Sequence, residues 1–199
     1  MNCLKIIIHA MNLLFKILIE LLKEWWYAKF KFIYSWKGRL WYEKNLKSDP
    51  NTMSYNAGYD VSYYGYHYDT GCIDFPEEKY EETYNKRLND NGFFAYIKDN
   101  ILNEFVGYCN YHYNKNEDKY ECGIIIDFKY RGNGYSNQAL KLLCNKAKEN
   151  GIKALYDSFE SDRDNTLKVF EAVGFKVVKK TTWKKFNKLI KGIVVKIEL

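Results

Sequence analysis

The sequence predicts a single α/β domain with a mixed β-sheet, preceded by an amphipathic helix. Runs of β-branched and aromatic residues alternate with segments of helical periodicity, and glycine, asparagine or proline separates them. The 199 residues suffice for one well-buried domain and are few for two. We therefore expect a helical extension over residues 1–29 and one domain over residues 30–199.

The expected order of elements is strand, two helices, three strands, helix, strand, helix and two strands. Helices are predicted at residues 38–47, 76–87, 134–149 and 165–173. Strands are predicted at residues 31–34, 93–98, 104–113, 119–127, 154–159, 175–182 and 193–199. Pro50 should end the first helix, because proline cannot continue a helical hydrogen-bond ladder. The tyrosine-rich residues 54–71 should form a loop.

The N-terminal extension has a narrow polar stripe on a broad apolar surface. Polar residues recur there at helical steps of three and four: Lys5, His9, Asn12, Lys16, Glu20 and Lys23. This regular interruption argues against a membrane span, and no small-residue cleavage site marks a signal peptide. Trp25 and Trp26 beside lysines suit a membrane interface. We favour, taken together, the alternatives of a helix docked on its own domain, a dimer contact or a start codon placed too far upstream.

Charge and cysteine content narrow the classes of function. The net charge is +6, made of +6 in residues 1–48, −7 in residues 49–175 and +7 in residues 176–199. An acidic central region favours a cationic substrate over nucleic acid, although scattered solvated charges would give the same totals. The five cysteines form no C-x-x-C pair and the three histidines show no ligand spacing. We expect a reduced cytoplasmic protein without a metal site.

A glycine-rich turn between a strand and a helix is the strongest functional signal. Ile124 and Ile126 belong to the strand, and Gly132 and Gly134 lie in the turn. Glycines allow successive backbone N–H groups to point at one anion, and the helix N-terminus adds partial positive charge. The segment therefore predicts a phosphate or pyrophosphate site. It lacks the Gly-Lys-Ser/Thr of a Walker loop and the third glycine of a dinucleotide fingerprint.

Two motifs in this half of the chain resemble those of the GNAT superfamily of N-acetyltransferases. Arg131-x-x-Gly134-x-Ser136 is similar to the acetyl-CoA signature R/Q-x-x-G-x-G/A, with serine where the family prefers glycine or alanine. A second family element is matched by Asn165, Phe170-Glu171 and Gly174-Phe175. The resemblance is strong over residues 90–178 and weak over residues 30–90.

This resemblance implies the GNAT fold, in which two central strands splay apart and acetyl-CoA lies in the cleft. Backbone groups of Ile124 and Ile126 would pair with pantetheine, and the amides of residues 132–136 would meet the pyrophosphate. The residues that we assign to the cofactor are Ile124, Ile126, Arg131, Gly132, Asn133, Gly134, Tyr135, Ser136, Asn165 and Phe170.

The implied reaction is direct attack of an amine on the thioester. A carboxylate normally removes the proton of the ammonium group, and Glu160 and Glu121 both match positions that carry a base in the family. We prefer Glu160 slightly. Phe170 stands where the family often has a tyrosine that protonates the leaving thiolate, so another acid or solvent must do so.

The acceptor pocket should form between the N-terminal helices, their loop and the strands that follow. The candidate lining residues are Tyr55, Asn56, Phe75, Tyr96 and Asn110, with Tyr59, Asp60, Cys72, Asp74, Phe94, Tyr108 and His112 nearby. Aromatic and acidic groups suit an ammonium ion, although many of these rings could serve only to pack the domain. The acceptor would be a small molecule or a peptide. The rival hypotheses are a non-catalytic acyl-CoA sensor and an interaction module at the membrane periphery.

Overall fold

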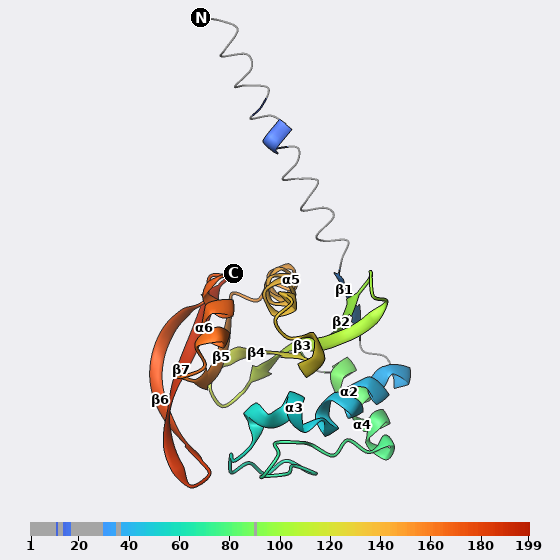
Figure 1. The fold of residues 1–199 in the computed structure, drawn as a ribbon, viewed down its shortest axis with the longest axis vertical. Coiled ribbons are helices and arrows are strands. Elements are labelled where there is room, and N and C mark those ends of the chain that lie inside the picture. Colours follow the sequence, from blue (N-terminus) through green and yellow to red (C-terminus); the bar gives the residue numbers. More distant parts are fainter. Residues whose placement is uncertain (1–10, 12–13, 17–29, 35–36, 90) are drawn as a thin grey trace, which may run out of the picture.

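A computed structural model describes residues 11, 14–16, 30–34, 37–89 and 91–199 (Figure 1). The predicted amphipathic helix at residues 4–27 thus lies almost entirely outside the described residues. Among the helices that are described, none is both long enough and apolar enough to cross a membrane.

The centre of the domain is a seven-stranded mixed sheet with the order β1-β2-β3-β4-β5-β7-β6. The strands are β1 Phe30–Tyr34, β2 Phe93–Asp99, β3 Glu104–Asn114, β4 Lys119–Ile126, β5 Ala154–Glu160, β6 Lys176–Lys185 and β7 Lys188–Glu198. Strands β4 and β5 are parallel, whereas the other neighbouring pairs are antiparallel. The predicted α/β class with a mixed sheet is confirmed.

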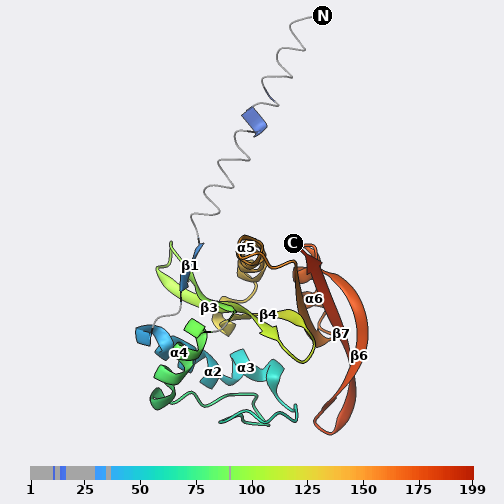
Figure 2. The same ribbon diagram turned by 180° about the vertical axis from the view of Figure 1, so that it is seen from behind.

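Helices cover both faces of this sheet (Figures 1 and 2). The helices are α2 Leu40–Ser48, α3 Pro50–Met53, α4 Tyr80–Asn89, α5 Tyr135–Glu149 and α6 Asp164–Glu171, with short 3-10 turns η1 Lys37–Arg39, η2 Ser54–Asn56, η3 Glu77–Lys79 and η4 Phe128–Tyr130. Helices α5 and α6 lie on one face, and α2, α3 and α4 lie on the other. The domain is therefore a three-layer sandwich, and each layer supplies part of the site.

Each helical layer has its own hydrophobic core. Helix α5 places Leu140 and Leu143 against the sheet, where both are fully buried together with Leu155 of β5. Their spacing follows the period of one helical face. On the other side, Tyr42 and Leu46 of α2 belong to a smaller aromatic core. The sheet is therefore packed against a separate hydrophobic core on each of its two faces.

Strands β4 and β5 diverge soon after they meet. Their ladder consists of one register pair, Glu121 with Tyr156, although both strands continue well beyond it. Beyond Glu121 the edge of β4 that faces β5 has no strand partner in the described part of the chain. The splayed central strands implied by the resemblance are thus present.

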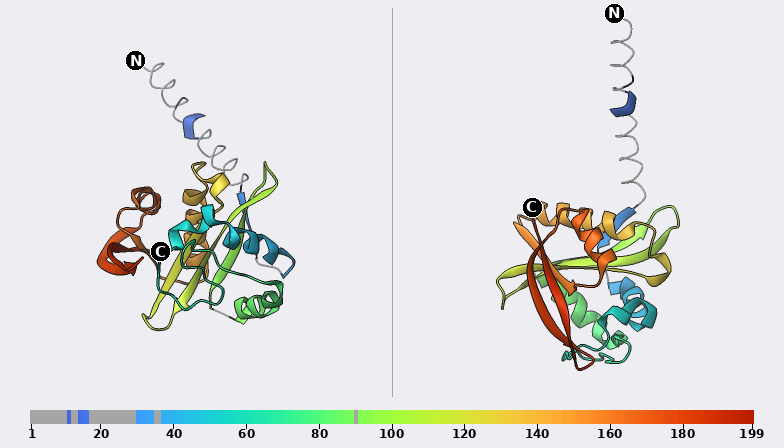
Figure 3. Two further views of the ribbon diagram at one scale, coloured as in Figure 1. Left: turned by 60° about the horizontal axis from the view of Figure 1, so that its bottom comes forward. Right: turned by 60° about the vertical axis from the view of Figure 1, so that its left-hand side comes forward.

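The structure corrects two of the predicted boundaries. The first helix ends before Pro50 as predicted, since α2 stops at Ser48 and Asp49 is extended, but the predicted turn is the start of α3, where Pro50 takes the first position and its missing N–H is not needed. The segment between the predicted strands 175–182 and 193–199 is mostly strand, because Phe186 and Asn187 adopt positive φ angles and close a tight hairpin. The long β6–β7 hairpin that results reaches the 54–71 loop (Figure 3).

Candidate active site

The glycine turn has the geometry of an open anion cradle. Gly132 and Gly134 have φ angles of +82° and +78°, and Gly134 is the residue before the first turn of α5. A Cβ atom built at either glycine would have no protein atom within 4 Å. The space in front of the turn is therefore empty of protein, while the helix N-terminus presents its first amides there.

The Arg131 side chain anchors this turn to the N-terminal helices. Its guanidinium donates to the carbonyl oxygens of Ile126 (3.2 Å), Asn51 (3.3 Å) and Thr52 (2.7 Å). These bonds hold the end of β4, the turn and α3 together. Since the side chain is committed to these carbonyls, Arg131 serves the expected anion site by positioning its backbone.

A second anchor joins α3 to the η4 turn that precedes the glycines. The buried Thr52 hydroxyl donates to an oxygen of the Asp49 carboxylate at 2.5 Å and accepts from the Phe128 N–H at 3.0 Å. Asp49 also caps α3 through the N–H groups of Asn51 and Thr52. The position of the glycine turn thus depends on residues about 80 positions earlier in the chain.

The diverging strands leave β4 with one free edge beside the glycine turn. Ile124 and Ile126 pair with Cys109 and Gly107 of β3 on the other edge. The Ile126 carbonyl oxygen accepts from Arg131, so this group is already satisfied. The backbone between Glu121 and Ile126 is the stretch on which an extended ligand could add as a further strand.

Glu160, the preferred candidate for the base, lies at the end of β5 in an ion pair. Its carboxylate accepts from Lys185 Nζ at 2.6 Å and from the Tyr59 hydroxyl at 2.8 Å. Burial acts to raise its pKa, but hydrogen bonds from Lys185 and Tyr59 and the charges of Lys185 and Arg163 hold the pKa below its usual value. This carboxylate ties the 54–71 loop to the β6–β7 hairpin and is a weak proton acceptor.

Glu121, the second candidate, lies where β4 and β5 begin to diverge. Its side chain is 28% exposed and lies 3.1 Å from Lys119 Nζ and 3.7 Å from His112 Nε2. Alternation along β4 directs it to the face covered by α2 and α3, opposite the α5 layer. Glu121 is accordingly a carboxylate at the strand divergence, on the face of the sheet that α2 and α3 cover.

A third carboxylate near the divergence of β4 and β5, that of Asp157, was not among the candidates from the sequence. It follows Tyr156, the last residue of β5 that pairs with β4, and it faces the α5–α6 layer between the buried Leu155 and Phe159. Its side chain is partly exposed, and an oxygen of the carboxylate accepts a hydrogen bond from the Ser158 N–H at 2.7 Å.

The environment of Asp157 keeps its carboxyl group protonated to unusually high pH. Its pKa is raised to about 7, chiefly by burial and to a lesser extent by the charge of Glu121, against the opposing effects of the Ser158 N–H and the charge of Arg163. The negative charge of Asp157 in turn helps to raise the pKa of Tyr55 and that of Cys122. A carboxyl group poised near neutral pH in a cleft is typical of proton transfer. The sequence contained no motif for it, because the shift comes from burial.

Two of the residues that the sequence assigned to the cofactor, Asn165 and Phe170, belong to α6. Phe170 is 2% exposed and packs against Phe159 and Phe175 with ring centroids 5.3 and 4.9 Å apart, so the structure assigns it to the core. Asn165 is exposed in the first turn of α6. Among Asn133, Tyr135 and Ser136, Asn133 is exposed in the turn, and the other two begin α5.

The five candidate acceptor residues are not gathered in one cavity. Asn110 lines a cavity of about 440 Å³ between α4, α2 and the sheet, which also contains Phe94, Tyr108 and His112. Tyr96, in contrast, is fully buried in the smaller core, and Phe75 is buried against Tyr80.

The remaining two candidates lie in the loop beyond α3. The Asn56 side chain donates to the Gly71 carbonyl oxygen at 3.1 Å, which stabilises the loop itself. Tyr55 lies under Arg163, with the guanidinium carbon 5.3 Å from the ring centre. Tyr55 therefore lies close to Arg163, just before α6, and it interacts electrostatically with Asp157.

The GNAT acetyltransferase family model matches residues 54–175 of the chain, which include the glycine turn and the diverging strands. The chain belongs to this family. No curated protein sequence matches it. Within the described residues, no group of histidine, cysteine and carboxylate side chains could hold a metal ion.

Solved acetyltransferase structures share the fold of this GNAT domain. Spermidine N-acetyltransferase from Vibrio cholerae, in complex with CoA and spermine, has a TM-score of 0.69 at 17% identity, covering 86% of this chain and 96% of that one. Phosphinothricin acetyltransferase from Sinorhizobium meliloti, in complex with acetyl-CoA, has a TM-score of 0.68 at 11% identity, covering 86% of this chain and 89% of that one. Ribosomal-protein-alanine N-acetyltransferase from Brucella melitensis has a TM-score of 0.67 at 14% identity, covering 85% of this chain and 99% of that one. At such low identity these structures establish the fold.

Proposed function

We propose that this GNAT domain is an N-acetyltransferase that moves the acetyl group of acetyl-CoA to the primary amine of a small molecule or a peptide. The observation that carries this proposal is the free edge of β4 leading into an open glycine turn at the N-terminus of α5. The structural neighbours support it, since two of them contain CoA or acetyl-CoA. Four free buried cysteines suit a reducing compartment such as the cytoplasm.

The residues present fit acetyl-CoA as the second substrate. The amides from Gly132 to Ser136 would hold the pyrophosphate, and the free backbone of β4 at Ile124 would pair with the pantetheine arm. A side chain at Gly132 or Gly134 would fill the space that the phosphates need. When bound, the thioester supplies an activated acetyl group.

We assign the role of general base to Glu121. An alkylammonium group has a pKa of about 10.4, so presenting it neutral at pH 7 costs about 4.6 kcal/mol. Glu121 faces the acceptor side where the strands diverge, and its carboxylate can take this proton directly or through water. Glu160 instead holds the loop and the hairpin in place through Tyr59 and Lys185.

Asp157 is the proton donor for the leaving thiolate in this proposal. Strand alternation puts it on the α5–α6 side of the cleft, opposite Glu121 and on the side of the glycine turn. As the amine nitrogen bonds to the carbonyl carbon and the C–S bond breaks, the Asp157 carboxyl group gives its proton to sulfur. Glu121 holds the proton taken from the amine, and solvent restores both groups.

The second candidate function is a non-catalytic module that binds acyl-CoA and senses or recruits a partner, at the membrane periphery if residues 4–27 bind lipid. The observation that favours it is Phe170, which has no acidic hydroxyl and is packed in the core. Release of free CoA thiol in the presence of a polyamine, an amino acid and a short peptide separates the two functions. An enzyme releases thiol with at least one acceptor in proportion to acetylated product, whereas a sensor binds acetyl-CoA and releases none.

The test of the cofactor site uses a matched pair of glycines at the two ends of α5. Gly134 and Gly151 both have φ of +78° and open space at the Cβ position. Valine is strained equally at both, since β-branched residues resist this conformation. We expect Gly134→Val to weaken acetyl-CoA binding at least 100-fold by calorimetry and Gly151→Val to leave it within about threefold. Equal affinity in the two variants would place the anion site elsewhere.

Steady-state kinetics of Glu121→Gln test the base. Glutamine keeps the shape of the side chain but accepts no proton, so the rate should fall about 10²–10⁴-fold while acetyl-CoA affinity stays unchanged. Raising the pH should restore much of the rate, because more amine is then already neutral. Glu160→Gln is the matched comparison, and a larger pH-rescuable loss in that variant would return the base role to Glu160.

A further inference from the structure

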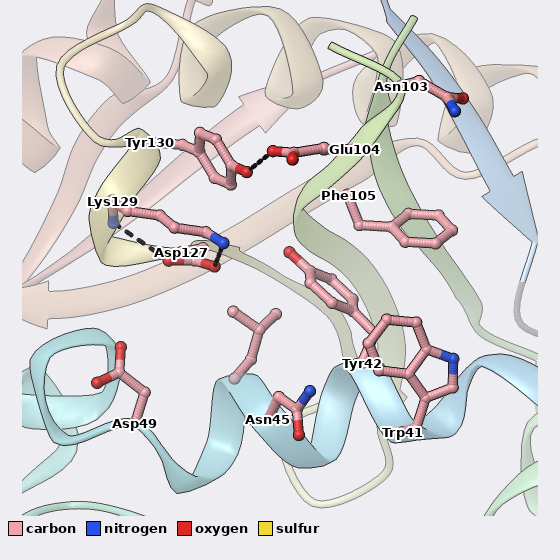
Figure 4. A pocket seen from close by; sticks show the side chains of 11 residues that line it. Trp41, Tyr42, Asn45, Asp49, Asn103, Glu104, Phe105, Asp127, Lys129 and Tyr130 are labelled. Atoms are coloured by element: carbon pink, nitrogen blue, oxygen red, sulfur yellow. Dashed lines mark hydrogen bonds and ion pairs between the residues drawn. The ribbon is translucent and has the colours of Figure 1, made fainter.

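The glycine turn offers a ligand backbone amides but no free cationic side chain. Residues 128–136 contain two cations, Lys129 and Arg131. The Arg131 guanidinium is held by three carbonyl oxygens, and Lys129 lies 3.8 Å from Asp127. Figure 4 shows the Lys129 side chain reaching toward Asp127 at a cavity of about 410 Å³, on the side of the turn where α2 lies. A bound pyrophosphate would therefore need its cation from another part of the chain.

Arg163 carries a partly buried guanidinium group without a hydrogen-bonding partner. It lies between β5 and α6, at the same end of the sheet as the glycine turn, because β4 and β5 are parallel. Within the described residues it forms neither a hydrogen bond nor an ion pair, and its nitrogen atoms remain accessible to solvent. A planar guanidinium with free donors is suited to two-point binding of a phosphate group.

The Tyr55 ring fixes the position of this guanidinium. The ring centre lies 5.3 Å from the guanidinium carbon, and Tyr55 belongs to η2, directly after α3. The carbonyl oxygens of α3 that accept from Arg131 are those of Asn51 and Thr52. The glycine turn and Arg163 are therefore docked on one short segment of the chain, from the ends of the two diverging strands. In agreement with this placement, Tyr55 interacts electrostatically with both arginines.

The carboxylates around Arg163 leave its charge available. Glu160 is already held in an ion pair, and the pKa of Asp157 is about 7, so much of this carboxyl group is neutral near pH 7. Asp162 and Asp164 flank Arg163 in the sequence, but both are exposed and neither forms an ion pair with it. The first turn of α6 adds the partial positive charge of a helix N-terminus.

We propose that Arg163 binds a phosphate group of acetyl-CoA from the β5 side of the strand divergence, opposite the amides of the glycine turn. The inference rests on the proposed function, since it concerns the same cosubstrate. Because Tyr55 contacts the guanidinium through its ring, all five N–H donors of Arg163 remain for oxygen atoms of the ligand. The glycine turn then supplies neutral donors, and Arg163 supplies the positive charge that the turn lacks.

Two ligands separate a phosphate contact from every other contact with the cosubstrate. They are acetyl-CoA and S-acetylpantetheine, which carries the same thioester arm and has no phosphate. Both are titrated into the full chain without an acceptor, by NMR, which also detects millimolar binding. Arg163→Gln should weaken acetyl-CoA about 10–100-fold and leave S-acetylpantetheine within about twofold. Arg163→Lys keeps the charge but loses the two-point geometry, so its affinity for acetyl-CoA should be intermediate.

Three further readings exclude a general effect of charge or of folding. Lys168→Gln removes an exposed cation of α6 and should change acetyl-CoA affinity less than about threefold. The affinity of the wild type should fall more steeply with salt than that of Arg163→Gln, which has lost one charged contact. Since the guanidinium has no hydrogen-bonding partner in the free protein, Arg163→Gln should shift the unfolding temperature by less than about 3 °C.

The outcomes distinguish this inference from the proposed function. Wild-type affinity for acetyl-CoA in Arg163→Gln would exclude Arg163 from the site. Equal losses for acetyl-CoA and S-acetylpantetheine, or a large drop in the unfolding temperature, would overturn the phosphate contact, because the variant would then act on the thioester arm or on the fold. A wild-type protein that binds neither ligand would instead refute the proposed function.

Discussion

Replacing Asp157 by asparagine removes a carboxylate whose charge is poorly solvated in the folded protein. The pKa of Asp157 is about 7, against 3.8 for the ordinary group, because the surrounding protein desolvates the carboxyl. The folded state therefore binds a proton more tightly than the unfolded chain between these two values. Wild-type stability should fall as the pH rises from about 4 to 7 and then remain constant.

The size of the stability difference follows from the shift in the pKa of Asp157. About three pKa units at 1.36 kcal/mol each give an upper limit of about 4 kcal/mol at pH 7 and above. Asparagine keeps the shape and carries no charge at any pH. Asp157→Asn should therefore be little different from wild type near pH 4 and more stable by up to about 4 kcal/mol at pH 8.

Urea unfolding followed by tryptophan fluorescence at pH 5 and pH 8 measures this difference. Asp162→Asn is the control, because the side chain of Asp162 is exposed and its replacement should change stability by less than about 0.5 kcal/mol at either pH. A stability gain of Asp157→Asn that is the same at both pH values, or a loss at pH 8, would refute the buried-carboxyl argument.

The same variant tests the proton donor. Acetylation by the wild-type enzyme should lose rate above pH 7 as Asp157 ionises, and Asp157→Asn should be slower by about 10²-fold without this alkaline decline. A variant that shows the stability change but retains the full rate would leave the burial argument intact and exclude Asp157 as the acid.

Three further predictions concern single contacts. Thr52→Val should lower the free energy of unfolding by about 1–3 kcal/mol in urea titrations, because it leaves the partly buried Phe128 N–H without its acceptor. Glu160→Gln should weaken the attachment of the 54–71 loop, which limited proteolysis would detect as faster cleavage there, whereas unchanged cleavage would show that Glu160 is not needed to hold it. Tyr42→Phe, which removes a buried hydroxyl that has no hydrogen-bonding partner within the described residues, should raise the melting temperature by about 2–4 °C for each 1 kcal/mol gained, and a lower melting temperature would mean that the hydroxyl has a partner in solution.

Local signals accounted for the parts of the fold that depend on neighbouring residues. The Ile124–Ile126 run, the two glycines after it and the apolar face of α5 are each written within a few positions, so strand, turn and helix were predictable together. The hairpin between β6 and β7 was harder to predict from the sequence. Its closure depends on positive φ angles at Phe186 and Asn187, which a phenylalanine seldom adopts.

Contacts between distant segments explain what the sequence could not show. Glu160 pairs with Lys185 and Tyr59, 25 and 101 positions away, and these partners make its carboxylate a weaker proton acceptor than the sequence suggests. Asp157 has an ordinary side chain in an ordinary strand, and only the surrounding protein raises its pKa. Burial of Phe170 likewise depends on rings brought from β5 and from the start of β6.

The single register pair between β4 and β5 has a consequence for hydrogen exchange. Amides of β4 that point toward the gap have no carbonyl acceptor from β5 beyond Glu121, so they should exchange with solvent far faster than the amides of β4 that face β3. A ligand that pairs with this edge would act as an eighth strand and protect these amides alternately along β4. The gap between β4 and β5 would then be closed only when a ligand is bound along this edge.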